Sequence, residues 1–195
     1  MADKPTRLKV VTPVFRVSFP AVFETAKPMA GDDGVGKKPK YEVTMVFDPS
    51  RFDDGEKKRF KEMEALLDHV AMEKFKKTVA KFPANFKKAF HDGAEKEHLA
   101  GFGAGLVYAK ASSFAKPGVV AADRVTPIED REAFYPGCYA RASVTAYAYD
   151  NVSKGVAFGL SNLMFVKDGE RLDSRTDPTE DFGEAPLGDS ADDLA

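Results

Sequence analysis

The side chains with the most distinctive chemistry lie in residues 138–149, where two kinds of side chain alternate. This alternation predicts a β-strand, because successive side chains of a strand point to opposite faces. The even-numbered positions from 140 to 148 are small and apolar and can lie on a core. The odd-numbered positions form an aromatic, hydroxylic and cationic face: Tyr139, Arg141, Ser143, Thr145, Tyr147 and Tyr149. Such a face suits a single-stranded nucleic acid, since rings can stack on bases and a cation can pair with phosphates.

A second predicted strand, residues 106–114, divides its side chains in the same way. One face is made of valine, alanine and serine, and the other carries Tyr108, Lys110, Ser112 and Phe114. The repetition in two strands favours a shared function over coincidence. The alternative is that the tyrosines pack beneath a loop or against a second sheet, since tyrosine serves readily in cores and interfaces.

Charge divides the chain into two parts. Residues 168–195 hold ten acidic and two basic side chains, a net charge of −8, whereas the remaining 167 residues hold 21 acidic and 27 basic side chains, a net charge of +6. A basic body with a separate acidic tail indicates that the body binds an anion. Acidic C-termini are also common solubility devices, which would explain the tail alone. Because the tail is rich in Gly, Pro and acids, we expect a folded domain over 1–168 and a disordered acidic tail over 169–195.

The composition argues against a membrane or secreted protein. The sequence has no apolar run near the roughly 18 residues that a membrane helix needs, and its N-terminus lacks the apolar segment of a signal peptide. Cys138 is the only cysteine, so no disulfide can form within the chain. These features predict a cytoplasmic protein.

No motif in the sequence matches a catalytic or cofactor site. The three histidines, His69, His91 and His98, do not have the spacing of metal ligands, and no phosphate-binding lysine loop or serine elbow is present. We therefore expect no enzymatic activity, no cofactor and no metal. The alternative is a small metal-dependent nuclease that uses His91, Asp92 and His98. Cys138 is most simply a small apolar side chain.

The remaining patterns predict a mainly β protein with one long helix. Alternating apolar residues indicate further strands over 10–19, 41–47 and 156–167, and a brief pairing at 119–120. Apolar residues at helical spacing indicate an amphipathic helix from Asp53 or Asp54 to about Ala80, with Asp53 and Glu56 as a capping box. A second, short helical segment is expected near 85–90. Residues 24–40 read as a loop with lysines at its far end: Lys37, Lys38 and Lys40.

Several of these segments together resemble a bacteriophage family of single-stranded-DNA-binding proteins, long catalogued only as a domain of unknown function. The matching segments are 12–24, 37–47, 116–120 with Asp123 and Arg124, 134–151, and 154–163. The resemblance implies an OB-fold, a five-stranded Greek-key barrel, that binds single-stranded DNA during phage replication or recombination. It also implies a disordered acidic C-terminus. The sequence departs from the usual OB-fold in one respect, because the long helix follows the second counted strand instead of the third.

The resemblance and the face patterns together define a candidate DNA site. The strand 138–149 would form part of the DNA groove, the strand 106–114 would lie next to it, and the first strand would add a cation. The candidate DNA-binding residues are Arg16, Tyr108, Lys110, Phe114, Lys116, Tyr139, Arg141, Tyr147 and Tyr149. Arg141, Tyr147 and Tyr149 are preferred within their strand, since Tyr139 lies close to the bend at Pro136–Gly137.

The predicted function is non-catalytic, largely sequence-independent binding of single-stranded DNA in the cytoplasm of a bacterial host. The acidic tail would compete with DNA for the basic body and would recruit replication or recombination proteins. The tail residues proposed for partner binding are Asp181, Phe182, Glu184, Asp189, Asp192 and Asp193. Besides the nuclease, a second alternative is a structural phage protein that uses the aromatic face as a protein interface.

Overall fold

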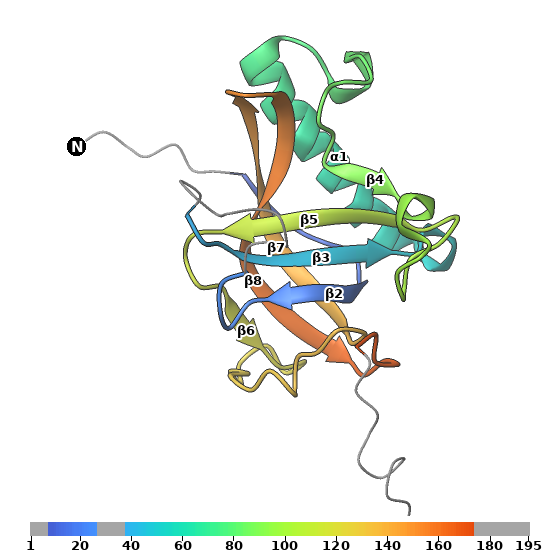
Figure 1. Cartoon of the computed structure of the whole chain (residues 1–195), viewed down its shortest axis with the longest axis vertical. Helices are drawn as coiled ribbons and strands as arrows, with labels where there is room; N and C mark the ends of the chain where they lie inside the picture. Colours follow the sequence, from blue (N-terminus) through green and yellow to red (C-terminus); the bar gives the residue numbers. More distant parts are fainter. Residues whose placement is uncertain (1–7, 27–37, 174–195) are drawn as a thin grey trace, which may run out of the picture.

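The computed structural model describes residues 8–26 and 38–173. Strands dominate it, and one long helix crosses one side of the strand assembly (Figure 1). The strands are β1 (Lys9–Val11), β2 (Phe15–Ala21), β3 (Tyr41–Phe47), β4 (Phe90–Asp92), β5 (Val107–Ser113), β6 (Gly118–Val120), β7 (Tyr139–Asp150) and β8 (Lys154–Lys167). The helix is α1 (Asp54–Phe75), and three short 3-10 turns are η1 (Pro49–Arg51), η2 (Val79–Lys81) and η3 (Gly93–Lys96).

Five strands close into a barrel in the order β2, β3, β5, β8, β7 and back to β2. All of these pairings are antiparallel except β5 with β8, which is parallel. This order, with the last two strands exchanged relative to the sequence, is the Greek-key arrangement of the OB-fold. The predicted fold class is therefore confirmed. The short strands β1, β4 and β6 extend the sheet beside β7, β5 and β8.

The alternation in the sequence correctly predicts the inward faces of the strands. On β7, Ala140, Ala142, Val144 and Ala146 are buried, while the residues between them are partly exposed. These small side chains leave space for the large ones of the neighbouring elements. The interior is filled by phenylalanines, with Phe47 in edge contact with Phe15, Phe60 and Phe90.

The helix α1 follows β3, the second strand of the barrel, as the strand count from the sequence implied. The side chain of Asp53 caps it by accepting a hydrogen bond from the Glu56 backbone N–H at 2.8 Å. The helix ends at Phe75 and not near Ala80, so the predicted C-terminus is wrong. Lys76 adopts a left-handed conformation with φ of 60° and donates its N–H to Met72, which ends the helix by an αL cap.

Two other predicted elements need correction. The strand predicted over 10–19 is divided into β1 and β2 by residues 12–14, because Pro13 has no N–H to donate to a strand partner. The helical segment predicted near 85–90 does not form; the chain makes a turn there and then enters β4. Phe90 of β4 packs at 4.8 Å from Phe60 and 5.4 Å from Phe158, measured between ring centroids, and this burial favours the strand.

A charged contact fixes the start of α1 on the barrel. The carboxylate of Glu56 forms a salt bridge with Arg141 on β7 and accepts a hydrogen bond from the Val14 N–H at 2.9 Å. Arg141 also donates to the Thr12 carbonyl at 3.2 Å. The side chains of Glu56 and Arg141 are only 13% and 22% exposed. The contact therefore joins α1, β7 and the β1–β2 connection in a poorly solvated position.

We predict that Glu56→Ala lowers the free energy of unfolding by about 2–3 kcal/mol, because it leaves the Arg141 charge and the Val14 N–H without their acceptor. Chemical denaturation measures the change. Lys57→Ala is the matched control, since Lys57 pairs with Asp54 in an exposed position, and it should leave stability nearly unchanged. Equal stability of the two variants would contradict the assigned role of Glu56.

Candidate nucleic-acid interface

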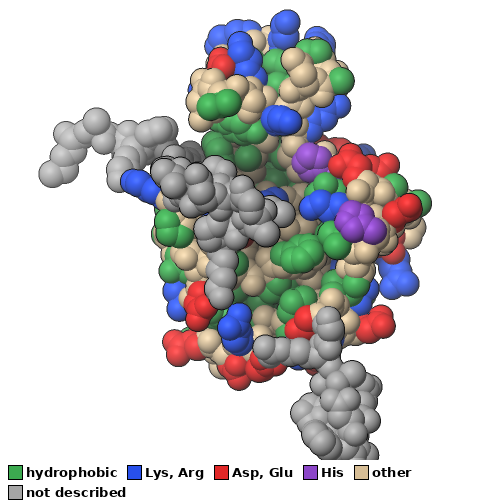
Figure 2. Space-filling view, viewed as in Figure 1, with side chains coloured by type: hydrophobic (Ala, Val, Ile, Leu, Met, Phe, Trp, Pro, Cys, Tyr) green, Lys and Arg blue, Asp and Glu red, His purple; other side chains and the backbone are tan. Residues whose placement is uncertain are grey.

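The strand register places chemically distinctive side chains in rows across the outside of the barrel. We call the outward side of β2, β3, β4 and β5 the front face; it faces the viewer in Figures 1 and 2. One row runs across five strands through Tyr139, Arg16, Val46, Tyr108 and His91. The next row along β2, β3 and β5 contains Ser18, Thr44 and Lys110. Figure 2 shows hydrophobic side chains in the middle of this face and histidines at its right edge.

Tyr108 is the centre of a small ring cluster on the front face. The His91 ring stacks on it with centroids 5.0 Å apart, Phe102 meets it edge-on at 5.4 Å, and the Lys96 ammonium lies 4.7 Å from its centroid. The hydroxyl of Tyr108 donates to Glu95 at 3.3 Å. Burial, together with the Glu95 charge, raises the pKa of Tyr108. Tyr108 is only 8% exposed, so the ring of this cluster that solvent reaches is His91, whose side chain is 40% exposed.

Phe19 is an exposed aromatic that the sequence pattern did not predict. Its place in the alternation puts it on the same face as Phe15 and Val17, which are buried. An irregularity in the pairing of β2 with β3 between Ser18 and Ala21 breaks the alternation, and Phe19 adopts a φ of 45°. Its ring is therefore 55% exposed, 6.5 Å from Phe102. Strained residues of this kind are often found at functional sites.

A second part of the surface is a groove across β5, β8 and β7, which we call the side groove. Its lining consists of Lys9, Lys40, Ser112, Ser113, Phe114, Ala115, Thr145, Tyr147, Gly159, Leu160 and Ser161. Phe114 is 63% exposed, and the Lys40 ammonium lies 4.8 Å from its centroid. Ser112 pairs with Gly159 in the parallel contact of β5 with β8. The front face therefore continues into the side groove along β5, past Lys110.

Tyr149 lies beyond Tyr147 on the same face of β7. The two ring centroids are 6.3 Å apart, and the Tyr149 hydroxyl is hydrogen-bonded to Ser153. Burial raises the pKa of Tyr149. A Cβ at Gly155 would lie 2.6 Å from the Tyr149 ring carbon that carries the hydroxyl, so the ring rests directly on the β8 backbone. Gly155 is the residue that permits this close contact.

Three of the predicted DNA-binding residues contact other parts of the chain. Arg16 donates to the Glu170 carbonyl at 2.8 Å and lies 3.5 Å from the Glu170 carboxylate. The Tyr139 ring is covered by the Lys167 ammonium at 4.9 Å, and Arg141 pairs with Glu56. The structure therefore does not bring these three side chains together with Tyr147 and Phe114.

The predicted lysines differ in their surroundings. Lys110 forms a 2.6 Å salt bridge with Glu42, although its side chain is still 56% exposed. Lys116 is exposed in the turn that leads into β6. Lys9 and Lys96 were not predicted as DNA contacts, and Lys40 was predicted only as part of the basic end of a loop. Their placement depends on how the strands close, which no local pattern reveals.

The C-terminal segment up to Asp173 packs on the barrel. The Tyr135 hydroxyl donates to Asp168 at 2.9 Å, and the Leu172 N–H donates to the Pro136 carbonyl at 2.9 Å. The contacts of this segment with the rest of the fold therefore continue as far as Leu172. The proposed partner-binding residues of the tail, 181–193, lie outside the described residues.

The nuclease alternative requires a metal site, and its three residues lie in the described part of the chain. Within that part, no group of three His, Cys, Asp or Glu side chains could hold a metal ion, so the proposed nuclease residues His91, Asp92 and His98 do not form a metal site there. Cys138 is buried, and burial raises the pKa of its thiol to about 11. No helix among the described residues is long and apolar enough to cross a membrane.

Comparison with known proteins identifies the family. The family model described as the single-stranded-DNA-binding protein of Enterobacter phage Enc34 matches residues 8–195. The chain belongs to this family. The resemblance seen in the sequence is thereby confirmed. A relative within the curated proteins, putative protein p50 of Acyrthosiphon pisum secondary endosymbiont phage 1, is 32% identical over 165 residues, which are 80% of this chain and 81% of the relative.

Solved structures of phage proteins share the fold. The single-stranded-DNA-binding protein of bacteriophage Enc34, in complex with single-stranded DNA, matches with a TM-score of 0.66 at 18% identity, over 85% of this chain and 89% of that one. The single-stranded-DNA-binding protein gp2.5 of bacteriophage T7 matches with a TM-score of 0.57 at 12% identity, over 95% and 100% of the two chains. At these identities the structural matches establish the fold alone.

Proposed function

We propose that this chain binds single-stranded DNA without catalysis and with little sequence preference, during replication or recombination of phage DNA in the bacterial cytoplasm. The observation that carries the proposal is the continuous surface of exposed rings and lysines on the front face and in the side groove. Membership in the Enc34 family supports it, as does the fold shared with a protein solved with single-stranded DNA. The ligand is a single strand because stacking needs bases that are free of a complementary strand.

The exposed rings supply the stacking surfaces. His91 and Phe19 are accessible on the front face, and Phe114 and Tyr147 line the side groove. Stacking of one base on an aromatic side chain is worth about 1–3 kcal/mol and tolerates every base. Tyr108 has a supporting role in this proposal, because it holds His91 in place from beneath.

Lysines near these rings supply the phosphate contacts. Lys40 lies over Phe114, Lys96 lies over Tyr108, and Lys9 lines the side groove. Lys110 lies between the two parts of the surface and would exchange Glu42 for a phosphate. Each phosphate contact releases counterions, so the affinity should fall as salt rises. Lys116 and Tyr149 extend this surface at its edges.

We also propose that the acidic tail competes with DNA for the basic body and recruits replication or recombination proteins. The contact of Glu170 with Arg16 supports the first part, since it pairs an acid of the C-terminal segment with a cation in the front row. In this account Arg16 contacts phosphate when that acid withdraws. Tyr139 and Arg141 also remain candidates, although Lys167 of β8 covers the Tyr139 ring and Glu56 of α1 pairs with Arg141.

We predict that Phe114→Ala combined with Tyr147→Ala weakens binding to oligo-dT at least about 30-fold, because two stacking contacts of about 1–3 kcal/mol each are lost. Fluorescence anisotropy measures the affinity. Val125→Ala is the control, as it removes an apolar side chain that is 78% exposed and lies outside the groove lining. Affinity of the double variant within a factor of about two of the unmodified chain would exclude the side groove as the stacking site.

We predict that removing residues 174–195, which keeps the packed segment up to Asp173, tightens binding to oligo-dT at low salt. The gain should vanish at high salt, where the charges of the tail are screened. A full-length variant with Asp181, Asp189, Asp192 and Asp193 changed to Asn should show a smaller gain in the same direction. Unchanged affinity of the truncated chain at low ionic strength would refute competition by the tail.

A further inference from the structure

The connection between α1 and β4 carries a dense group of lysines. Residues 74–90 contain six lysines and no aspartate or glutamate. We call this segment the lysine lobe, and all six of its lysines are exposed: Lys74, Lys76, Lys77, Lys81, Lys87 and Lys88. Figure 2 shows basic side chains gathered at the top of the molecule, where α1 ends. The DNA site described above does not include any of them.

The lysines of the lobe are not neutralised by acidic partners among the described residues. Lys57, Lys110 and Lys154 each form a salt bridge with a carboxylate. Within the described part of the chain, no carboxylate forms a salt bridge with a lysine of the lobe. Like charges held together repel one another and destabilise the compact state. An anionic ligand with several charges would relieve this repulsion.

The lobe is built on a packed apolar base. The rings of Phe82 and Phe86 stack with centroids 3.9 Å apart, and Phe75 meets them edge-on at 5.4 and 5.8 Å. The side chain of Asp68 accepts the Val79 N–H at 2.7 Å and fixes the turn after α1. The lysines are therefore held in place by a folded element, and the rings beneath them are turned inward.

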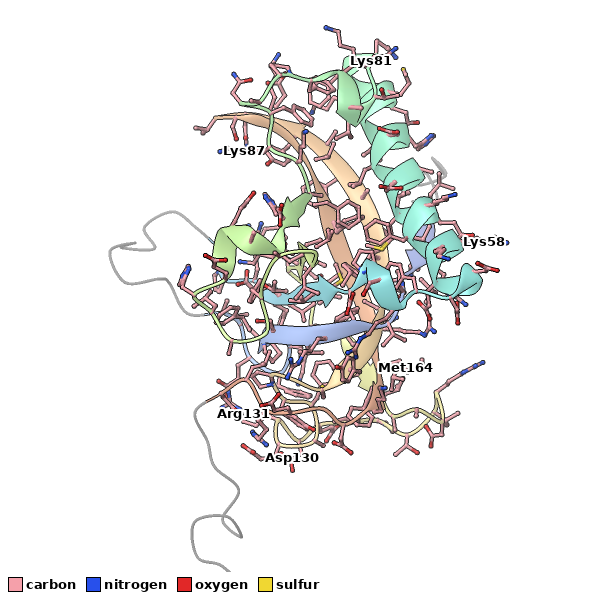
Figure 3. All side chains as sticks on the ribbon, turned by 90° about the vertical axis from the view of Figure 1, so that its right-hand side faces the viewer. Lys58, Lys81, Lys87, Asp130, Arg131 and Met164 are labelled. Atoms are coloured by element: carbon pink, nitrogen blue, oxygen red, sulfur yellow. The ribbon has the colours of Figure 1, made fainter. Side chains whose placement is uncertain are left out.

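The lobe is joined directly to the start of β8, next to the aromatic face of β7. The Lys87 N–H donates to the Lys154 carbonyl at 3.0 Å, and the Val156 N–H donates to the Lys87 carbonyl at 3.0 Å. A Cβ built at Gly155 would lie 2.6 Å from the Tyr149 ring and 2.7 Å from the Lys87 Cβ, so these two side chains meet over Gly155. Figure 3 shows Lys87 beside the β7–β8 hairpin and Lys81 at the far side of the lobe. The lobe begins where the ring row Phe114, Tyr147, Tyr149 ends.

We propose that the lysine lobe is a second DNA-contacting surface, which binds the backbone phosphates of the strand that leaves the side groove past Tyr149. This inference rests on the proposed function. The lobe contacts phosphates and not bases, because its cations are exposed and its rings pack against one another. It lengthens the site without adding sequence preference. Lys87, next to Tyr149, makes the first contact, and Lys81 and Lys88 follow.

The test compares two triple variants that each remove three positive charges. Lys81→Gln, Lys87→Gln and Lys88→Gln neutralise the lobe, and Lys57→Gln, Lys58→Gln and Lys61→Gln are the matched control on the first turns of α1, at its opposite end (Figure 3). Binding is measured by anisotropy with oligo-dT of increasing length at several salt concentrations. A blunt duplex is measured alongside. Thermal unfolding verifies that both variants are folded.

With long oligo-dT, the lobe variant should bind less tightly, and its slope of log affinity against log salt should be less steep by about 2, since three contacts of about 0.7 each are lost. With oligo-dT too short to leave the groove, it should bind like the unmodified chain. The control variant should match the unmodified chain at every length. This pattern would support the lobe as an extension of the single-strand site.

Three results would overturn the inference: no loss in the lobe variant at any length, equal losses in both triple variants, or a loss confined to the duplex. In each of these the side groove would still bind oligo-dT and still depend on Phe114 and Tyr147. Failure of the proposed function looks different, because the unmodified chain itself would not bind oligo-dT. That result would contradict both the proposed function and the role of the lysine lobe.

Discussion

The parallel contact of β5 with β8 closes the barrel, and the whole candidate surface depends on it. It consists of two pairs, Ala111 with Phe158 and Ser112 with Gly159. Ala111 and Phe158 point into the core and are completely buried, so they hold the two strands together from within. Ser112 and Gly159 point outward into the side groove. Without this closure Phe114, which follows β5, would be separated from Tyr147 of β7 in an open sheet.

The position of α1 after β3 determines where the lysine lobe lies on the barrel. Glu56 fixes the start of the helix to β7 through Arg141, and Phe75, Phe82 and Phe86 anchor its end. The helix is thereby positioned so that the connection to β4 pairs with the β7–β8 hairpin. This placement brings the lysine lobe next to Tyr149. A helix inserted at another point of the barrel would not present its lysines to the end of the aromatic row.

The sequence predicts which side chains of the strands point inward, but it does not predict which contacts the outward side chains make, for a physical reason. Burial imposes a strict alternation, so the strands and the closed barrel are predictable, the latter with the help of the family resemblance. An outward side chain can bind a ligand or a neighbour in its own chain, and local pattern does not distinguish the two. Arg16 and Arg141, for example, pair with Glu170 and Glu56, and their role as DNA contacts stays a prediction. The exposure of Phe19 was not predicted. It results from the irregularity in β2, and the alternation of apolar residues in the sequence does not reveal that irregularity.

The central claim is that exposed rings and lysines on this barrel bind a single strand of DNA. Equilibrium binding of the unmodified chain to oligo-dT, oligo-dA and oligo-dC over a range of salt concentrations tests it most directly. The account predicts binding to all three, with log affinity falling linearly with log salt at about 0.7 per phosphate contact. The absence of binding, or an affinity that does not change with salt, would contradict it.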